Sequence, residues 1–154
     1  MSRIFRVGDD IDTDALAPGR YMAAPLDTLA GHCLESVDPD FAGSVEPGDV
    51  LIAGRNFGMG SSREQAAQAL KHLGLAGIVA HSFAGIFYRN AINLGLPVFA
   101  FSDPIDAEPG ALGILDVDAA TLTLPFGREA FFQMRDQSAV LDKPQKEIGK
   151  RFQI

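Results

Sequence analysis

Between residues 50 and 101 the chain alternates compact apolar runs with amphipathic segments, and this alternation limits the possible folds most strongly. The apolar runs, each of a length typical of a buried strand, cover residues 50–53, 78–80 and 97–101. The two segments between them carry apolar side chains at helical spacing and end at Gly74 and Gly95. A strand–helix–strand–helix–strand order favours parallel strands joined by right-handed crossovers. The sequence therefore predicts an α/β fold: a mixed, largely parallel sheet with helices mainly on one side.

The flanking regions carry weaker signals for shorter elements. We expect a strand at residues 4–7, a loop at 12–25, a short helix at 26–34 and a hairpin built from 114–117 and 121–124. From residue 135 the chain is polar and weakly patterned, which fits a helix or a loose tail. We therefore expect one domain over residues 1–154, with its core at about 4–125 and a C-terminal extension at 126–154.

Composition and charge exclude several classes of protein. The chain has 154 residues, 47% of them hydrophobic, which suits one packed domain. Its 13 basic and 20 acidic residues give a net charge of −7, so binding to nucleic acid or to a membrane surface is disfavoured. The N-terminus lacks an apolar signal core, and no run approaches membrane-spanning length. The lone Cys33 cannot form an internal disulfide or hold an iron–sulfur cluster unaided. We expect a cytoplasmic protein.

The most informative segment is the glycine-rich loop at residues 54–60, between a predicted buried strand and a predicted helix. Such a junction directs backbone N–H groups and the positive end of a helix toward one point, which favours anion binding. Three known loop types are excluded. A P-loop needs lysine where Gly60 stands, a dinucleotide fingerprint needs a third glycine, and a hydrolase elbow needs glycine where Glu64 stands.

Two serines and an arginine follow this loop. Ser61 with Glu64, and Ser62 with Gln65, form two overlapping capping boxes, so either serine has a purely structural interpretation. A helix has only one N-cap residue, however, so the second serine is left free beside Arg63. A free hydroxyl at the positive end of a helix, next to a guanidinium, suits proton abstraction or the binding of a carboxylate.

The run from Gly54 to Glu64 resembles the signature of the aconitase-type swivel domain, and within it the small subunits of 3-isopropylmalate dehydratase. Three further segments, at residues 8–14, 18–21 and 82–97, agree with that family in order and spacing. The resemblance covers residues 4–125. It implies a single swivelling domain of β/β/α type.

The resemblance also implies an activity, a partner and roles for individual residues. Enzymes of this family are hydro-lyases that move a hydroxyl group between adjacent carbons of a malate-like acid. A [4Fe–4S] cluster in a separate large subunit accepts the hydroxyl, so this chain is expected to bind no cofactor itself and to form a heterodimer or heterotetramer. Ser61 matches the serine that acts as the base, and Ser62 and Arg63 match residues that bind the substrate carboxylate. Asp14 matches an aspartate near the site, although in this acidic loop it equally fits a turn or cap residue.

The segment Tyr21, Met22 and Ala23 matches the part of the family that selects the substrate. Relatives that act on homoaconitate carry an arginine there, whereas this chain has Ala23 and Ala24. Small apolar residues leave room for an alkyl group, which favours 3-isopropylmalate in leucine biosynthesis, or another alkylmalate such as citramalate. Gln65 and Gly85 depart from the family's histidine and arginine. The alternatives are another hydroxy-acid substrate, such as homoaconitate, and a non-catalytic anion-binding module of the same fold.

Overall fold

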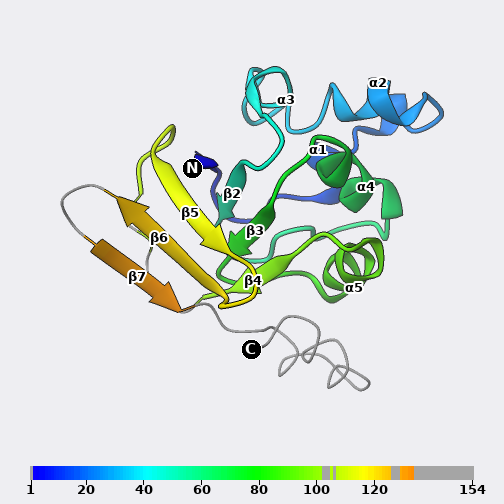
Figure 1. Ribbon diagram of the computed structural model, residues 1–154. Helices are drawn as coiled ribbons and strands as arrows, with labels where there is room; N and C mark the ends of the chain where they lie inside the picture. The colour runs from blue at the N-terminus through cyan, green and yellow to red at the C-terminus, as the bar shows by residue number, and fades with distance from the viewer. Residues whose placement is uncertain (1, 102–104, 106, 126–128, 134–154) are drawn as a thin grey trace.

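A computed structural model describes residues 2–101, 105, 107–125 and 129–133. Seven strands form one sheet in the order β4-β3-β2-β1-β5-β6-β7 (Figure 1). The strands are β1 (Ser2–Arg6), β2 (Val50–Ala53), β3 (Gly77–Ala80), β4 (Val98–Ala100), β5 (Leu112–Asp116), β6 (Thr121–Pro125) and β7 (Glu129–Gln133). The helices are α1 (Thr13–Leu16), the 3-10 turn η1 (Gly19–Tyr21), α2 (Leu26–Ala30), α3 (Phe41–Ser44), α4 (Glu64–His72) and α5 (Gly85–Leu94). None of the described helices is long and apolar enough to cross a membrane.

The sheet is mixed, as the sequence predicts. Strands β1 to β4 pair in parallel, and β1, β5, β6 and β7 pair in antiparallel fashion. The helices α1, α4 and α5 gather on one side of the parallel half, while β5 to β7 extend away from it (Figure 1). The expected α/β class is therefore confirmed, and so is the hairpin of β5 and β6.

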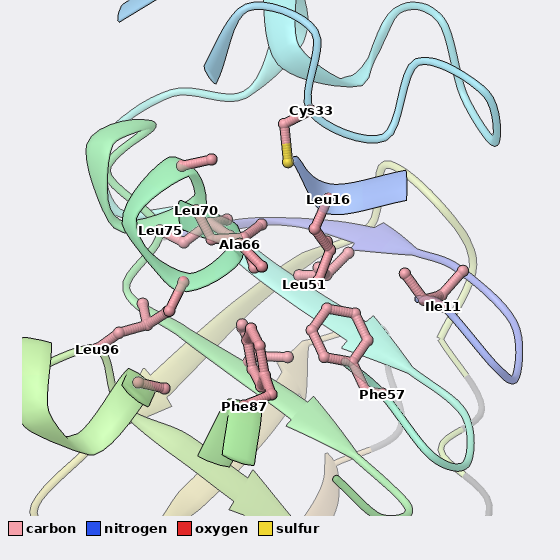
Figure 2. Packing of buried hydrophobic residues seen from close by; sticks show 14 of the residues in the cluster. Ile11, Leu16, Cys33, Leu51, Phe57, Ala66, Leu70, Leu75, Phe87 and Leu96 are labelled. Carbon is pink, nitrogen blue, oxygen red and sulfur yellow. The ribbon is translucent and has the colours of Figure 1, made fainter. Parts of the chain in front are cut away.

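The central strands consist of consecutive apolar residues because each face of the sheet packs into an apolar cluster. On the helix side, Leu51 and Ile78 pack with Leu70 and Phe87 from α4 and α5 (Figure 2 shows Leu51, Leu70 and Phe87). On the other side, Val50, Ile52 and Val79 pack with Leu122 and Leu124 of β6. The antiparallel half thus covers the face that carries no helices. All four residues of both β2 and β3 are buried, because each face of these strands is covered.

Several element boundaries differ from those expected. The segment 12–25 contains α1 and η1, because Asp12 caps α1 by accepting a hydrogen bond from the Ala15 N–H at 2.8 Å. The helix expected at 26–34 ends at Ala30. The short α3 was not predicted, and neither was β7, which carries the sheet beyond the expected core limit at residue 125. The tail from residue 135 lies outside the described residues.

Three segments that are distant in the sequence meet around the glycine-rich loop. On one side the loop is hydrogen-bonded to residues 8–13 by four backbone bonds. In these bonds an N–H group donates to a carbonyl oxygen: Gly54 to Gly8 (3.1 Å), Asp10 to Arg55 (2.8 Å), Gly58 to Ile11 (2.7 Å) and Thr13 to Met59 (2.9 Å). On the other side it is hydrogen-bonded to residues 81–84 through His81 N to Gly54 O, Phe57 N to Ser82 O and Ala84 N to Phe57 O (2.9–3.0 Å). This backbone network fixes the starts of α4 and α5 relative to each other.

Gly58 is the point of the network that lies against the buried aromatic side chain of α5. Its φ is +85°, and a Cβ atom added there would lie 2.3 Å from Cγ of Phe87, whose ring is 2% exposed. The ring is buried between Phe57 and Phe83, with centroids 5.1 Å and 6.2 Å away, so it cannot move aside easily. Glycine is therefore required both by the backbone conformation and by the close approach of α5.

We expect Gly58→Ala to lower the free energy of unfolding by about 2 kcal/mol or more, because it adds both backbone strain and overpacking. Urea denaturation followed by circular dichroism measures the change. Gly43→Ala in α3 is the matched control, since nothing lies within 4 Å of its added Cβ. The control substitution should leave the free energy of unfolding unchanged or raise it by up to about 1 kcal/mol. Equal stability of the two variants would contradict the packing described for Gly58.

Candidate active site

A cavity of about 130 Å³ opens between the start of α4 and the start of α5. It brings together three residues singled out in the sequence: Ser61, Ser62 and Arg63. Both serines are exposed, and Arg63 is partly buried. The remaining lining residues are Thr13, Gly58, Gly60, Ala84, Gly85, Ile86, Phe87 and Asn90. The two hydroxyl groups and the guanidinium group therefore share one open cavity.

The capping boxes predicted for the serines are wrong. The N-cap of α4 is Arg63, with extended backbone dihedrals, and no side chain caps the helix. The Arg63 N–H donates to the Ser61 carbonyl at 2.8 Å, a three-residue turn that places both serines ahead of the helix. Both serine side chains are therefore released from capping. In the first turn of α4 the Ala66 N–H donates to the Arg63 carbonyl at 3.2 Å, and the N–H groups of Glu64 and Gln65 have no partner within the helix.

Arg63 is held at the cavity by the α1 region. Its Nη1 donates to Oδ1 of Asp14 at 2.9 Å and to the carbonyl oxygen of Ala17 at 3.0 Å. In the described part of the chain both side-chain hydrogen bonds of Arg63 use Nη1, so Nη2 and Nε remain available to a ligand. A guanidinium group oriented in this way can bind a carboxylate with its free edge.

Asp14 lies beside the cavity and contacts Arg63 directly. Its Oδ1 also accepts the Gly19 N–H at 3.0 Å, so the carboxylate links α1, η1 and Arg63. The hydrogen bond from Arg63, and then that from Gly19, hold the pKa of Asp14 below its usual value. The expected structural role of the acidic residues in this loop is met by Asp12, which caps α1, and also by Asp14, which accepts the Gly19 N–H at the start of η1.

Tyr21, Met22 and Ala23 do not line this cavity. The Tyr21 ring is stacked on His32, with ring centroids 3.7 Å apart, and Met22 packs against the core. Ala23 is exposed. The substrate-binding role of these three residues stays a prediction.

None of the other eight lining residues was predicted as part of the site, and Thr13, Ile86 and Asn90 are among them. Thr13 is 3% exposed and reaches the cavity because its N–H is hydrogen-bonded to Met59, a long-range contact that no local pattern indicates. Ile86 and Asn90 lie one turn apart on α5. Their spacing was visible in the sequence, but the approach of α5 to the glycine-rich loop was not.

Within the described residues, no group of three or more His, Cys, Asp or Glu side chains is arranged to hold a metal ion. Cys33 is fully buried, and burial raises the pKa of its thiol, which disfavours the thiolate form that metals bind. The donor groups of this part of the chain therefore do not fit an iron–sulfur cluster.

The hydrogen bond from Arg63 to Asp14 leads to a prediction about the pKa of the Asp14 carboxyl group. Asp14 should titrate below its usual pKa of 3.8, and Arg63→Ala should raise that pKa toward 3.8 by removing the stronger of its two donors. Because the folded-state pKa is lowered, the stabilisation from this contact is present above the usual pKa of 3.8 and is lost as the pH falls through the lower, folded-state pKa. Carboxyl-detected NMR measures both titrations, with Arg20→Ala as the control. An unchanged Asp14 pKa in Arg63→Ala would contradict the contact.

Comparisons with known proteins agree with this fold. The family model for the aconitase C-terminal domain matches residues 31–103. A 3-isopropylmalate dehydratase small subunit of Halothermothrix orenii is 48% identical over 125 residues, covering 80% of this chain and 76% of that protein. A methanogen homoaconitase small subunit of Methanothermobacter thermautotrophicus is 56% identical over 109 residues, covering 70% of this chain and 63% of that protein.

A solved structure matches almost the whole chain. The crystal structure of a 3-isopropylmalate dehydratase from Methanocaldococcus jannaschii has a TM-score of 0.82 and 36% identity to this chain. It covers 99% of this chain, and this chain covers 89% of it. Together with the glycine-rich loop and the two serines, these matches show that the chain belongs to the 3-isopropylmalate dehydratase small-subunit family of the aconitase superfamily.

Proposed function

We propose that this chain is the small subunit of a hydro-lyase that interconverts 2-isopropylmalate and 3-isopropylmalate by dehydration and rehydration, in the cytoplasm. One observation carries the proposal: Ser61, Ser62 and Arg63 line one cavity at the start of a helix that no side chain caps. The relatives named as 3-isopropylmalate dehydratase small subunits support the reaction class and the substrate.

Within this proposal Ser61 is the base that removes a proton from the carbon next to a substrate carboxylate. A serine hydroxyl is a poor base in water, so its charged form needs strong stabilisation. The positive end of α4 and the guanidinium of Arg63 supply such stabilisation at the cavity. Ser62 and the free edge of Arg63 bind a carboxylate, and Asp14 holds Arg63 in position from the α1 side.

The remaining part of the site comes from a partner. A cavity of about 130 Å³ is smaller than the pockets of about 300–1,000 Å³ that enclose whole small ligands. We infer that a large iron–sulfur subunit covers the cavity, in a heterodimer or heterotetramer. A [4Fe–4S] cluster bound by that subunit would supply the Lewis acid for the departing hydroxyl group. The contribution of this chain is the base and the carboxylate-binding groups.

A second substrate class is favoured by one comparison. The relative from Methanothermobacter thermautotrophicus, at 56% identity, is named as a homoaconitase small subunit. Against that substrate, Ala23 and Ala24 provide no cation for a further carboxylate. We therefore place isopropylmalate first and homoaconitate second. An assay of the assembled complex on both substrates distinguishes them.

We expect Ser61→Ala to lower kcat by several orders of magnitude, because the base is lost while the carboxylate-binding groups remain. The test uses the complex reconstituted with a cluster-bearing large subunit, and size-exclusion chromatography checks that it assembles. Ser44→Ala is the control, since Ser44 ends α3 and does not line the cavity. Near-normal turnover of an assembled Ser61→Ala complex would exclude Ser61 as the base. A chain that joins no cluster-bearing partner would favour the anion-binding module instead.

Arg63→Lys tests the carboxylate-binding role. A lysine keeps the charge but has no planar edge, so it cannot contact Asp14 and a substrate carboxylate with separate nitrogen atoms. We expect kcat/KM of the assembled complex to fall about 10-fold to 100-fold. Arg55→Lys, at an exposed position of the same loop outside the cavity, is the control and should retain activity. Unchanged steady-state kinetics in Arg63→Lys would contradict the role.

A further inference from the structure

One wall of the cavity is formed by α5 and carries no group that the proposed chemistry uses. Ile86 and Asn90 are four residues apart on this helix, so their side chains lie on the same face, one turn above the other. The same cavity is lined by Ser61, Ser62 and Arg63 at the start of α4. A molecule bound by Arg63 within this cavity would therefore lie next to residues of α5.

The first turn of α5 makes an apolar surface at the rim of the cavity. Ile86 is 52% exposed, and the other lining residues of this turn are Ala84, Gly85 and the buried Phe87. Exposure alone does not mark a binding residue, because Ile114 on β5 is 49% exposed and lies outside the cavity. Ile86 differs because it adjoins the two hydroxyl groups and the guanidinium in one cavity. A short alkyl group is the kind of ligand part that such a surface binds.

Asn90 adds a polar group to the same wall. It is partly buried, and in the described part of the chain its side-chain amide forms no hydrogen bond, unlike Asn56, whose Nδ2 lies 3.4 Å from Asp10. An amide can donate to a carboxylate or accept from a hydroxyl group. A partly buried amide without a partner loses hydrogen bonds to water that a ligand would restore.

The charge of the cavity also limits the ligand. Arg63 is the one cationic residue among the lining residues that the structure describes, and part of its charge is already balanced by Asp14. Apart from the partial positive charge of its helix start, the α5 wall offers no cationic side chain to a substituent that carries its own carboxylate. A charged substituent placed against Ile86 would lose hydration without gaining an ion pair.

We propose that the α5 wall selects the substrate: Ile86 contacts a short, branched alkyl substituent of a hydroxydicarboxylic acid, and Asn90 hydrogen-bonds a carboxylate or hydroxyl group of the same molecule. The proposal rests on the proposed function and adds a specificity determinant to it. It assigns the selection of the alkyl group to α5, separately from the role predicted for Tyr21, Met22 and Ala23.

The test compares three malates, with isopropyl, methyl and 2-carboxyethyl substituents, in the reconstituted complex at saturating large subunit. Ile86→Ala should lower kcat/KM about 10-fold or more for the isopropyl substrate and less than about 3-fold for the methyl substrate. Ile86→Arg should raise the ratio of carboxyethyl to isopropyl activity by about 10-fold. Asn90→Ala should lower kcat/KM about 10-fold for every substrate that the wild-type complex turns over, because its contact does not involve the substituent.

Two controls match these substitutions. Ile114→Ala removes an equally exposed isoleucine outside the cavity, and Asn93→Ala removes an exposed asparagine of the same helix outside the cavity. Both should leave all kinetic ratios unchanged. If Ile86→Ala changes kcat/KM equally for all substrates, or changes only the affinity for the large subunit, Ile86 does not select the substituent and the proposal is overturned. A wild-type complex without activity on any of the three malates would instead overturn the proposed function.

Discussion

The backbone hydrogen bonds around the glycine-rich loop determine where every group of the candidate site lies. They join residues 54–60 to residues 8–13 on one side and to residues 81–84 on the other. Because the partners are main-chain groups, the arrangement depends on backbone conformation more than on side-chain identity. Positive φ angles at Asn56, Gly58 and Gly60 allow the loop to run between its two neighbours. The open cavity exists because this network brings the starts of two helices together.

Electrostatics at the cavity follow from the same contacts. The chain carries a net charge of −7, so the site that we propose for a dicarboxylate needs local compensation. Arg63 provides it, and Asp14 fixes its orientation while occupying only Nη1. Asp14 is well exposed, so solvent screens its charge and leaves Arg63 with much of its attraction for an anion. The ion pair therefore orients the guanidinium more than it neutralises it.

The sequence predicts this fold best where local pattern and tertiary packing agree. Helix α5 ends where expected, because its apolar face continues to Leu94 and Gly95 adopts the left-handed conformation directly after it. The start of α4 was not predictable, because Arg63 is held by Asp14, 49 residues away, and this contact overrides the capping boxes of Ser61 and Ser62. The grouping of the two serines with Arg63 was predictable from their adjacency. The contribution of α5 to the same cavity was not, since it depends on the close approach of Gly58 to Phe87.

The two walls of the cavity differ in what a substitution would disturb. The serines and Arg63 follow directly on the hydrogen-bonded loop, so changes there risk altering the backbone network that forms the site. Ile86 lies in the first turn of α5, and the hydrogen bond that anchors this helix start joins Ala84 N to Phe57 O without involving the Ile86 side chain. A change at residue 86 can therefore alter the shape and polarity of one part of the cavity while the serines and Arg63 stay in place. On the proposed function, such a separation would let the accepted substituent change without a change in the reaction chemistry.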